Sequence, residues 1–484
     1  MSEPTLSELT KQVSDAQTAI NFVWTLVGGF LVMFMQSGFA LLETGLTRAK
    51  NVAHTMGMNL VVYAIGILAF WAVGFAFQMG GVGALSTLGG DSTLARELTI
   101  HVGGKELGLL GARGFFLAGA TFTPAVAVMF LFQMVFMDTA ATIPTGALAE
   151  RWKFTSFVLF SFVAATVIYP VYANWVWGGG WLSTLGKNYG LGHGHVDFAG
   201  SSVVHLTGGV MAFVGAKLVG PRAGKFGADG SVRPIPGHNI PMVVLGTLIL
   251  AFGWFGFNAG STLAGTDSQI GVIATNTMLA SAAGAMSSYV YLMVRYKKPD
   301  VTMICNGMLA GLVAITAPCA FVSAPTSVFI GVVAGVLVVL VAVFVEQRLK
   351  VDDPVGAVAV HGANGIWGVL ALGLFANGTY GDALNGVDGK VRGLLYGDAS
   401  QLGAQCIGVL ANVAYVGAVA ALGFFVIGKF VGNRVTAEEE IVGLDEAEIG
   451  IRGYSAEQGH AIAPEIAPES APVVHTAIAV RQPG

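Results

Sequence analysis

Long apolar runs, separated by short polar connections, occupy most of the chain between residues 20 and 431. A helix needs about 20 apolar residues to cross the hydrocarbon core of a bilayer, and eleven stretches meet that length. They lie near residues 20–46, 54–79, 123–148, 154–176, 198–219, 239–260, 271–295, 301–320, 326–347, 355–377 and 400–431. This pattern predicts an all-α integral membrane protein with eleven transmembrane helices.

The connections between these runs differ in positive charge. Fifteen of the 24 Lys and Arg residues fall on one side of the predicted membrane and seven on the other. Because membrane proteins keep an excess of Lys and Arg in their cytoplasmic loops, the first side is predicted to be cytoplasmic. An odd number of crossings then places the N-terminus outside and the C-terminus inside.

The same pattern divides the chain into three regions. Residues 1–19 form an external polar segment that lacks the features of a cleavable signal, so the first apolar run is expected to direct insertion. Residues 20–431 form the membrane domain, in which the Gly-rich external connection 80–122 is long enough to fold over the mouth of the bundle. Residues 432–484 form a cytoplasmic tail, and its Ala/Pro-rich distal part is predicted to be disordered.

Composition supports a membrane protein and excludes several other classes. The chain is 54% hydrophobic and 11% charged, with 68 glycines that allow close helix packing in lipid. A net charge of −4 gives no indication of nucleic-acid binding. The three cysteines lack metal-ligand spacing, and no catalytic triad, phosphate loop or zinc motif is present, so neither an enzyme nor a metal site is expected.

One polar pattern occurs twice inside the predicted helices: Asp, seven residues, His, three residues, Gly. The first copy is Asp197, His205 and Gly209, and the second is Asp353, His361 and Gly365. The copies lie in the fifth and tenth runs, so they cross the membrane in opposite directions, as in two inverted five-helix repeats. The two histidines are therefore expected to meet near the midplane, in a site for a permeating solute.

Each of these residues also has an ordinary structural interpretation. A single membrane histidine is often an interhelical hydrogen-bond partner, and an aspartate near the end of a span usually caps a helix. The matched spacing favours a functional role for the histidines and a mainly structural role for the aspartates. Glu43 and Asp138 are the other acids at membrane depth, and an intramembrane acid is a functional hypothesis by default.

Aromatic residues gather at the external ends of several runs. They occur in "NWVWGGGWL", in "FGWFGFNAGS" and in "FLFQMVF", where Phe132 and Phe136 lie one helical turn apart. Such residues often form only an interfacial belt. Glycines beside Trp177 leave its ring face open to a vestibule, however, and a ring face attracts a small cation.

The residues quoted above, together with further motifs, resemble the ammonium transporter family (Amt/Mep/Rh). The resemblance extends from "FMQSGFALLETGLTRAKN" through "GALAERWKF", "DFAGSSVVH", "GWFGFNAGS" and "DDPVGAVAVHGANGIWG" to the tail, and Trp177 indicates the Amt branch. It implies eleven helices with inverted repeats of five, a homotrimer in the cell membrane, and ammonium or methylammonium as substrate. It implies no cofactor.

The resemblance also implies roles for particular residues. Those matching the external recruitment site for ammonium are Trp177, Phe132, Phe136 and Ser261, with Asp197 as the supporting aspartate. Phe136 and Phe257 match the phenylalanine gate, and His205 and His361 match the twin histidines of the pore. Ammonium would lose a proton at the vestibule, ammonia would pass the apolar pore, and the histidines would relay the proton.

The chain departs from the family pattern in three places. Asp138 stands where a small neutral residue is usual, which makes it a possible extra cation site or a hydrogen-bond partner of a neighbour. The connection before Asp197 is longer than usual and carries His193 and His195. In the tail, "GLDEAEIGIRGY" has Ile449 and Ile451 in place of a His and a Glu, so binding of a PII-type signalling protein at the cytoplasmic face is expected with altered details.

Two other functions remain open at this point. The chain could be an ammonium sensor that binds the ion with little flux and signals through its tail. His205 and His361 could alternatively be the axial ligands of a buried haem in an electron-transfer protein, since opposed histidines between helices can hold one.

Overall fold

The structure is a computed structural model that describes residues 4–83, 86–90, 93–380 and 389–454. The predicted distal tail lies outside these residues, beyond Tyr454. In the described part, ten helices are long and apolar enough to cross a membrane, and a shorter apolar helix, Val301–Thr316, accompanies them. Together they fall at the eleven predicted runs, which confirms an all-helical membrane protein with ten to eleven candidate spans.

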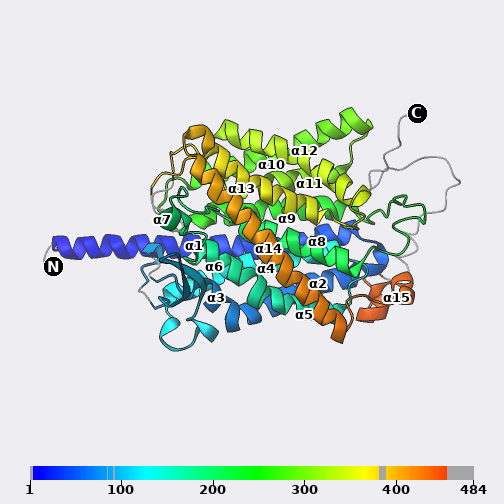
Figure 1. Ribbon diagram of the computed structural model, residues 1–484, viewed down its shortest axis with the longest axis horizontal. Coiled ribbons are helices and arrows are strands. Elements are labelled where there is room, and N and C mark those ends of the chain that lie inside the picture. The colour runs from blue at the N-terminus through cyan, green and yellow to red at the C-terminus, as the bar shows by residue number, and fades with distance from the viewer. Residues whose placement is uncertain (1–3, 84–85, 91–92, 381–388, 455–484) are drawn as a thin grey trace.

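The helices that form the spans, some of them segments of one span, make up the bundle in Figure 1. In the first half they are α1 (Leu6–Leu46), α2 (Val52–Ala69), α3 (Phe75–Met79), α4 (Pro124–Leu148), α5 (Phe154–Val163), α6 (Tyr169–Trp177) and α8 (Thr207–Val219). In the second half they are α9 (Ile240–Asn258), α10 (Ile270–Tyr296), α11 (Val301–Thr316), α12 (Ala324–Gln347), α13 (Asn364–Phe375) and α14 (Ala399–Phe430).

Several spans contain a wider π-helical turn. These turns are η2 (Phe70–Gly74) between α2 and α3, η6 (Ala164–Ile168) between α5 and α6, η7 (Ser201–Leu206) before α8, and η9 (Val358–Ala363) before α13. The short helices outside the bundle are α7 (Leu185–Tyr189) and α15 (Ala437–Val442), and η11 (Asp445–Ile449) follows α15. One-turn 3₁₀ segments occupy Ala49–Asn51, Ser86–Leu88, Phe115–Leu117, Gly119–Thr121, Ala259–Thr262 and Leu394–Tyr396.

The first helix is longer than the first apolar run. It begins at Leu6, where Thr5 and Glu8 form a reciprocal capping box, and not near residue 20 as the hydrophobic pattern predicts. Figure 1 shows its N-terminal part projecting from one end of the bundle, with α15 at the opposite end. The predicted external segment is therefore largely a helical extension of the first span.

The connection 80–122 contains strands that the all-α prediction did not include. Strands β1 (Glu97–Val102) and β2 (Lys105–Gly111) form an antiparallel hairpin with an irregularity between Leu98 and Thr99. Trp175 at the end of α6 donates its indole N–H to the carbonyl of Leu109 at 2.8 Å. The hairpin thus covers the end of the bundle from which α1 projects, which we call the hairpin end; the end that carries α15 is the tail end.

Glycines set the closest helix contacts. In α1 and α9, a Cβ on Gly246 would lie 2.6 Å from the carbonyl oxygen of Gly38, and a Cβ on Gly256 would lie 2.4 Å from that of Gly28. No side chain fits between these two backbones. Lipid supplies no hydrophobic force between helices, so this close van der Waals packing is what holds them together.

Candidate functional site

The two predicted histidines touch at the centre of the bundle. Their Nδ1 atoms are 3.2 Å apart, and the rings are nearly parallel, with centroids 5.2 Å apart and an interplanar angle of 22°. His205 is 0% exposed and His361 is 5% exposed. Since each ring offers the other one nitrogen, one Nδ1 must donate and the other accept, which lets the pair hold a single shared proton.

Both histidines lie in π-helical turns that aspartates cap. Asp197 accepts hydrogen bonds from the backbone N–H groups of residues 200–203 at 2.7–3.0 Å and from the hydroxyl of Ser202 at 2.7 Å. Asp353 accepts from the N–H groups of Gly356 at 3.0 Å and Val358 at 2.8 Å. The first turn of a helix has N–H groups without intrahelical partners, and these carboxylates satisfy them.

The glycine of each copy receives the backbone of the other copy. A Cβ on Gly209 would lie 2.3 Å from the nitrogen of Gly362, in the turn that holds His361. A Cβ on Gly365 would lie 2.6 Å from the carbonyl oxygen of Ser201 and 2.9 Å from the nitrogen of Leu206, in the turn that holds His205. Each residue of the repeated pattern thus has its own role. The Asp caps the turn, the His supplies the imidazole, and the Gly allows the close backbone contact that brings the two imidazoles together.

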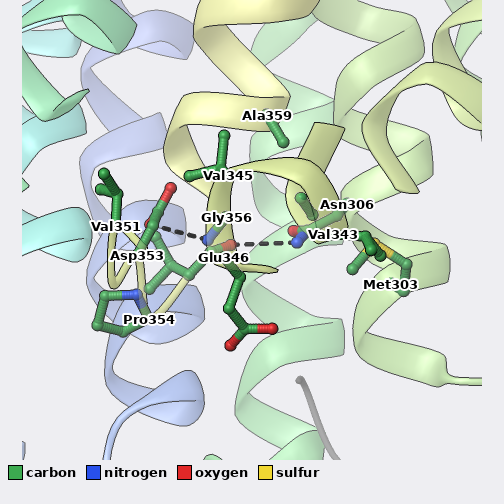
Figure 2. Close-up of a pocket in the computed structure, with 12 residues that line it drawn as sticks. Met303, Asn306, Val343, Val345, Glu346, Val351, Asp353, Pro354, Gly356 and Ala359 are labelled. Atoms are coloured by element: carbon green, nitrogen blue, oxygen red, sulfur yellow. Dashed lines mark hydrogen bonds between the residues drawn. The ribbon is translucent and has the colours of Figure 1, made fainter. Parts of the chain in front are cut away.

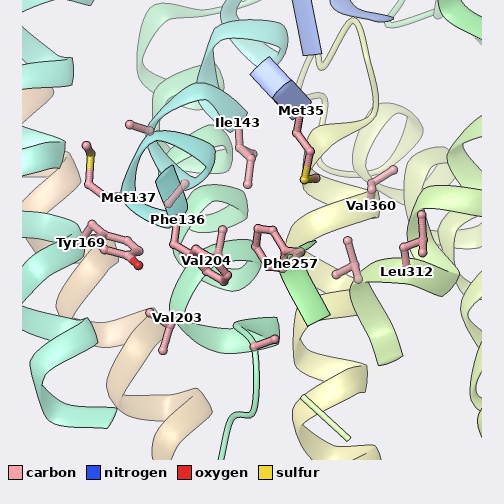
Figure 3. Packing of buried hydrophobic residues seen from close by; sticks show 14 of the residues in the cluster. Met35, Phe136, Met137, Ile143, Tyr169, Val203, Val204, Phe257, Leu312 and Val360 are labelled. Carbon is pink, nitrogen blue, oxygen red and sulfur yellow. The ribbon is translucent and has the colours of Figure 1, made fainter. Parts of the chain in front are cut away.

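A continuous row of aromatic rings leads from the hairpin end to the histidines. Phe136 stacks on Phe257 with centroids 4.3 Å apart, and Figure 3 shows these two rings side by side in the buried cluster. The ring of Trp177 meets the edge of Phe136 at 6.0 Å, and His205 lies 5.3 Å from Phe257. The sequence therefore identified residues that the fold brings into one line.

The remaining predicted recruitment residues lie around the start of this row. Phe132 packs 4.7 Å from Phe136, centroid to centroid. Ser261 is buried and donates its hydroxyl to the carbonyl of Phe257 at 2.7 Å. Trp177 donates its indole N–H to the backbone carbonyl of Asp197 at 2.7 Å, so the cap of the first copy also positions the tryptophan.

Asp138 does not join this row. It follows Phe136 by two residues on α4, which places the two side chains on different faces of the helix. Its Oδ1 is buried without a hydrogen-bond partner in the described residues, and it lies 3.6 Å from where a Cβ on Gly66 of α2 would stand. Helical periodicity predicts that Asp138 and Phe136 lie on different faces, but it does not predict the contact of Asp138 with α2.

His195 supports the first cap, a contact that the sequence did not indicate. Its Nε2 lies 2.9 Å from the hydroxyl oxygen of Ser202, which in turn donates to Asp197. Burial lowers the pKa of the His195 imidazole, although the charge of Asp197 acts in the opposite direction. The long connection before Asp197 therefore contributes a buried neutral ring to the polar shell of the cap.

A buried ion cluster lies at the tail end, directly before Asp353, the first residue of the second Asp–His–Gly copy. Arg222 binds both carboxylate oxygens of Asp352 at 2.9 Å and Oε1 of Glu150 at 3.0 Å. Burial alone would raise the pKa of the Asp352 carboxyl, but Arg222 and Arg151 outweigh burial and hold it below its ordinary value. These residues are far apart in sequence, so no local pattern predicts the cluster.

Two small cavities lie on the tail-end side of His361. The first has a volume of about 10 Å³, close to the space of one water molecule, and its lining includes Phe39, Glu43 and His361. The second has a volume of about 40 Å³ and shares Asn306 and Val355 with the first. Figure 2 shows the second cavity, with Asp353 and Glu346 among its lining residues.

The described part of the tail packs on the ends of the first helices. Asp445 accepts a hydrogen bond from the backbone N–H of His54 at 2.9 Å, and the Tyr454 hydroxyl lies 2.7 Å from Nε2 of His238. A Cβ on Gly57 would lie 4.0 Å from the side chain of Ile449, whereas Ile451 is exposed. The first altered tail position thus faces the bundle and the second faces solvent.

The contact between the histidines speaks against a haem. An iron and its porphyrin would have to lie between two nitrogens that are 3.2 Å apart. Trp254 covers the other side of His205, with ring centroids 5.2 Å apart. These side chains leave no room for a macrocycle at the histidine pair.

The fold and the site together define a multi-pass membrane protein with a histidine pair enclosed behind stacked aromatic rings, the architecture of a transport protein rather than an enzyme. Residues 23–454 match the model of the Ammonium Transporter Family. The ammonium transporter Amt2 of Archaeoglobus fulgidus is 46% identical over 93% of this chain and 91% of its own length. The chain belongs to the ammonium transporter family.

Solved structures agree with this assignment. A structure described as "Sensor Amt Protein" is 35% identical, with a TM-score of 0.78 over 90% of this chain and 99% of its own. Mep2 of Candida albicans is 27% identical, with a TM-score of 0.75 over 93% of both chains. The fold is therefore shared with a family that occurs in archaea, fungi and plants. Its sequence relatives include an ammonium transporter of tomato, which is 34% identical over 91% of this chain and 94% of its own length.

Proposed function

We propose that this chain moves ammonium across the cytoplasmic membrane by separating it into ammonia and a proton. The observation that carries the proposal is the direct contact of two buried imidazoles behind a stacked pair of phenylalanines. Trp177, Phe132, Phe136, Ser261 and Asp197 form the recruitment site, where ring faces hold the cation. Cation–π attraction contributes about 0.5–2 kcal/mol, which holds an ion and still lets it leave.

The apolar path explains why the ion must lose a proton. Moving a charged group into a dry, low-dielectric passage is prohibitive, whereas neutral ammonia can pass between apolar walls. Phe136 and Phe257 form the gate through which ammonia reaches the histidines. His205 and His361 relay the released proton, and because two adjacent imidazolium rings would repel each other, they carry one proton at a time. Transport is then electrogenic.

The membrane arrangement belongs to the same proposal. The N-terminus and the hairpin end face outside, the tail end faces the cytoplasm, and two inverted five-helix repeats cross at the midplane. The reciprocal fit of Gly209 against Gly362 and of Gly365 against Leu206 supports the inverted arrangement. The division into segment 1–19, membrane domain 20–431 and tail 432–484 follows from it.

The proposed assembly is a homotrimer in the lipid bilayer of the cell membrane. The family resemblance supports it, as do the large apolar side chains that α1, α9 and α14 leave exposed in a single chain. A PII-type signalling protein is a further proposed partner at the tail end, where the first turns of α15 and η11 expose Glu438 and Glu446, with Glu439 and Glu448 partly exposed beside them. Ammonium or methylammonium is the substrate, and no cofactor takes part.

A sensor function is the second candidate, because the structure called "Sensor Amt Protein" resembles this chain over nearly its whole length. A sensor with little flux would bind ammonium at the same aromatic site and report through the tail. Uptake of labelled methylammonium by proteoliposomes separates the two functions: a transporter accumulates label many times faster than empty liposomes, and a pure sensor does not.

Electrical recording on supported membranes tests the mechanism. An ammonium pulse onto proteoliposomes is expected to evoke a transient positive inward current, and His205→Ala is expected to abolish it while the protein remains folded. The mechanism is wrong if the wild type transports label without current, or if the His205→Ala current equals that of the wild type.

A further inference from the structure

Glu43, an acid that this mechanism does not use, shares a cavity with the histidine pair. Its side chain and the ring of His361 both line the cavity of about 10 Å³. The ring of Phe39 lies 6.2 Å from that of His361, and Glu43 follows Phe39 by one helical turn on the same face of α1. The carboxyl group therefore lies next to the histidine pair, on the side toward the tail end.

The hydrogen bonds of Glu43 come from two side chains and from the backbone of Gly146, which lies beside Oε1. Oε2 accepts from the amide of Asn59 at 2.8 Å and from the hydroxyl of Thr145 at 2.7 Å. Among the residues that the structure describes, Oε1 accepts no side-chain hydrogen bond, and no basic side chain forms an ion pair with this carboxyl, which is 2% exposed. An unpaired acid at membrane depth beside a cavity is the environment of a proton carrier.

A route continues from Glu43 to the surface. The second cavity shares Asn306 and Val355 with the first, and the Asn306 amide donates to the carbonyl of Val355 at 3.1 Å between them. The second cavity has room for several water molecules and reaches Glu346, whose side chain is 15% exposed. The two cavities thus lie one after the other between His361 and the tail end, and the hydrogen bond of Asn306 to Val355 separates them.

We propose that Glu43 is the acceptor that takes the relayed proton from His361 and passes it to water in the second cavity. The proposal rests on the transport mechanism above. Because Nδ1 of His361 contacts His205, Nε2 is the atom that exchanges the proton. The N–H bond at Nε2 breaks, its electron pair stays on nitrogen, and an O–H bond forms on Glu43, directly or through one water in the first cavity. Glu43 then releases that proton to water of the first cavity, from which it passes Asn306 to water of the second cavity, and Glu43 is a carboxylate again.

A purely structural role for Glu43 makes different predictions. The same carboxyl links α1 to Asn59 of α2 and Thr145 of α4, so its loss could loosen the bundle. Glu43→Gln keeps the size and an oxygen that accepts both hydrogen bonds but cannot be protonated in this range. Thr145→Val removes one of the two hydrogen bonds and keeps the carboxyl, so it is the matched control.

The test compares wild type, Glu43→Gln, Glu43→Asp and Thr145→Val in proteoliposomes. General acid–base groups contribute at least about 100-fold to proton transfer, so a reduction of the ammonium-evoked current of at least tenfold is expected for Glu43→Gln. Glu43→Asp is expected to recover a large part of the current with a shifted dependence on internal pH. Thr145→Val is expected to stay within twofold of wild type, with all four proteins equally folded by thermal melting.

The outcomes separate this proposal from the transport mechanism. If the wild type carries current, His205→Ala abolishes it and Glu43→Gln matches the wild type, the role of Glu43 is refuted and the histidine relay stands. If Thr145→Val loses current together with Glu43→Gln and both melt at lower temperature, Glu43 is structural and the proposal is also wrong. If the wild type carries no current, the mechanism itself fails first.

Discussion

The two halves of the bundle each contribute a capped π-helical turn with one histidine, yet the two histidines face different surroundings. His205 packs against the adjacent rings of Trp254 and Phe257, whose centroids are 5.2 and 5.3 Å from its own. His361 lines a cavity with Glu43. The same local construction therefore occurs in two different surroundings. Aromatic rings pack on His205, whereas His361 lines a small, mostly apolar cavity that contains the carboxyl of Glu43.

The caps differ in strength as well. Asp197 accepts five hydrogen bonds and receives further support from His195 through Ser202. Asp353 accepts fewer, from the backbone N–H groups of Gly356, Ala357 and Val358. The first turn also positions Trp177, so it supports the proposed recruitment site as well as a histidine. More hydrogen bonds are found where more of the site depends on the turn.

The largest expected effect is loss of the first cap. In Asp197→Ala, four backbone N–H groups and one hydroxyl lose their acceptor, and each buried unsatisfied group costs about 1–3 kcal/mol. That sum approaches the whole stability of a typical protein, so no folded protein is expected to accumulate. Asp353→Ala leaves at most three such groups and should lower the melting temperature while folded protein persists. Size-exclusion profiles and melting curves of both variants in detergent check this difference, and equal losses would contradict it.

The second effect concerns the crossing glycines. In Gly209→Ala the new Cβ would meet the backbone of Gly362 at 2.3 Å, whereas in Gly365→Ala it would meet Ser201 at 2.6 Å. Overpacking of this kind costs about 1–3 kcal/mol or more, because backbone cannot move aside as a side chain can. We expect both variants to lose stability, Gly209→Ala more, and both to lose ammonium-evoked current as the histidines separate. Gly271→Ala, where a Cβ meets nothing within 4 Å, is the control, and its current should equal that of the wild type.

The smallest effect concerns the aromatic side of the first half. Trp177→Leu removes a ring face but keeps an apolar side chain, so about 0.5–2 kcal/mol of cation attraction is lost, a 2- to 30-fold weaker apparent affinity for ammonium. The maximal current at saturating ammonium should change less than the affinity. Concentration dependence of the current measures both quantities. A large drop in maximal current with unchanged affinity would instead place Trp177 in the conduction step.

Much of this arrangement could be predicted from sequence because it depends on local pattern. The apolar runs located the spans, and the repeated spacing paired His205 with His361. The hairpin was missed although its signal is present: two glycines, Gly103 and Gly104, separate short alternating segments, which is typical of a hairpin turn. The start of α1 was missed because a polar helix that leaves the membrane has no hydrophobic pattern to mark it.

Other features could not be predicted because they depend on contacts between distant parts of the chain. The ion cluster of Arg222, Asp352 and Glu150 joins three separate connections. The cavity beside Glu43 exists only where α1 meets the turn of His361. The sequence left the role of Asp138 open. Its position toward Gly66 depends on how α4 is rotated relative to α2, and residue spacing gives that rotation only approximately.

The fit of Gly209 against the turn of His361 has a mechanical consequence. Two main chains that touch without side chains between them are separated by the van der Waals contact distance of their atoms. Compressing such a contact costs more energy than rotating a side chain. The gap that the proposed proton relay would cross between the imidazoles is thus set by direct backbone contact, which has low compressibility. Changes in bilayer thickness or lateral tension would deform the lipid-facing helices well before they altered that gap.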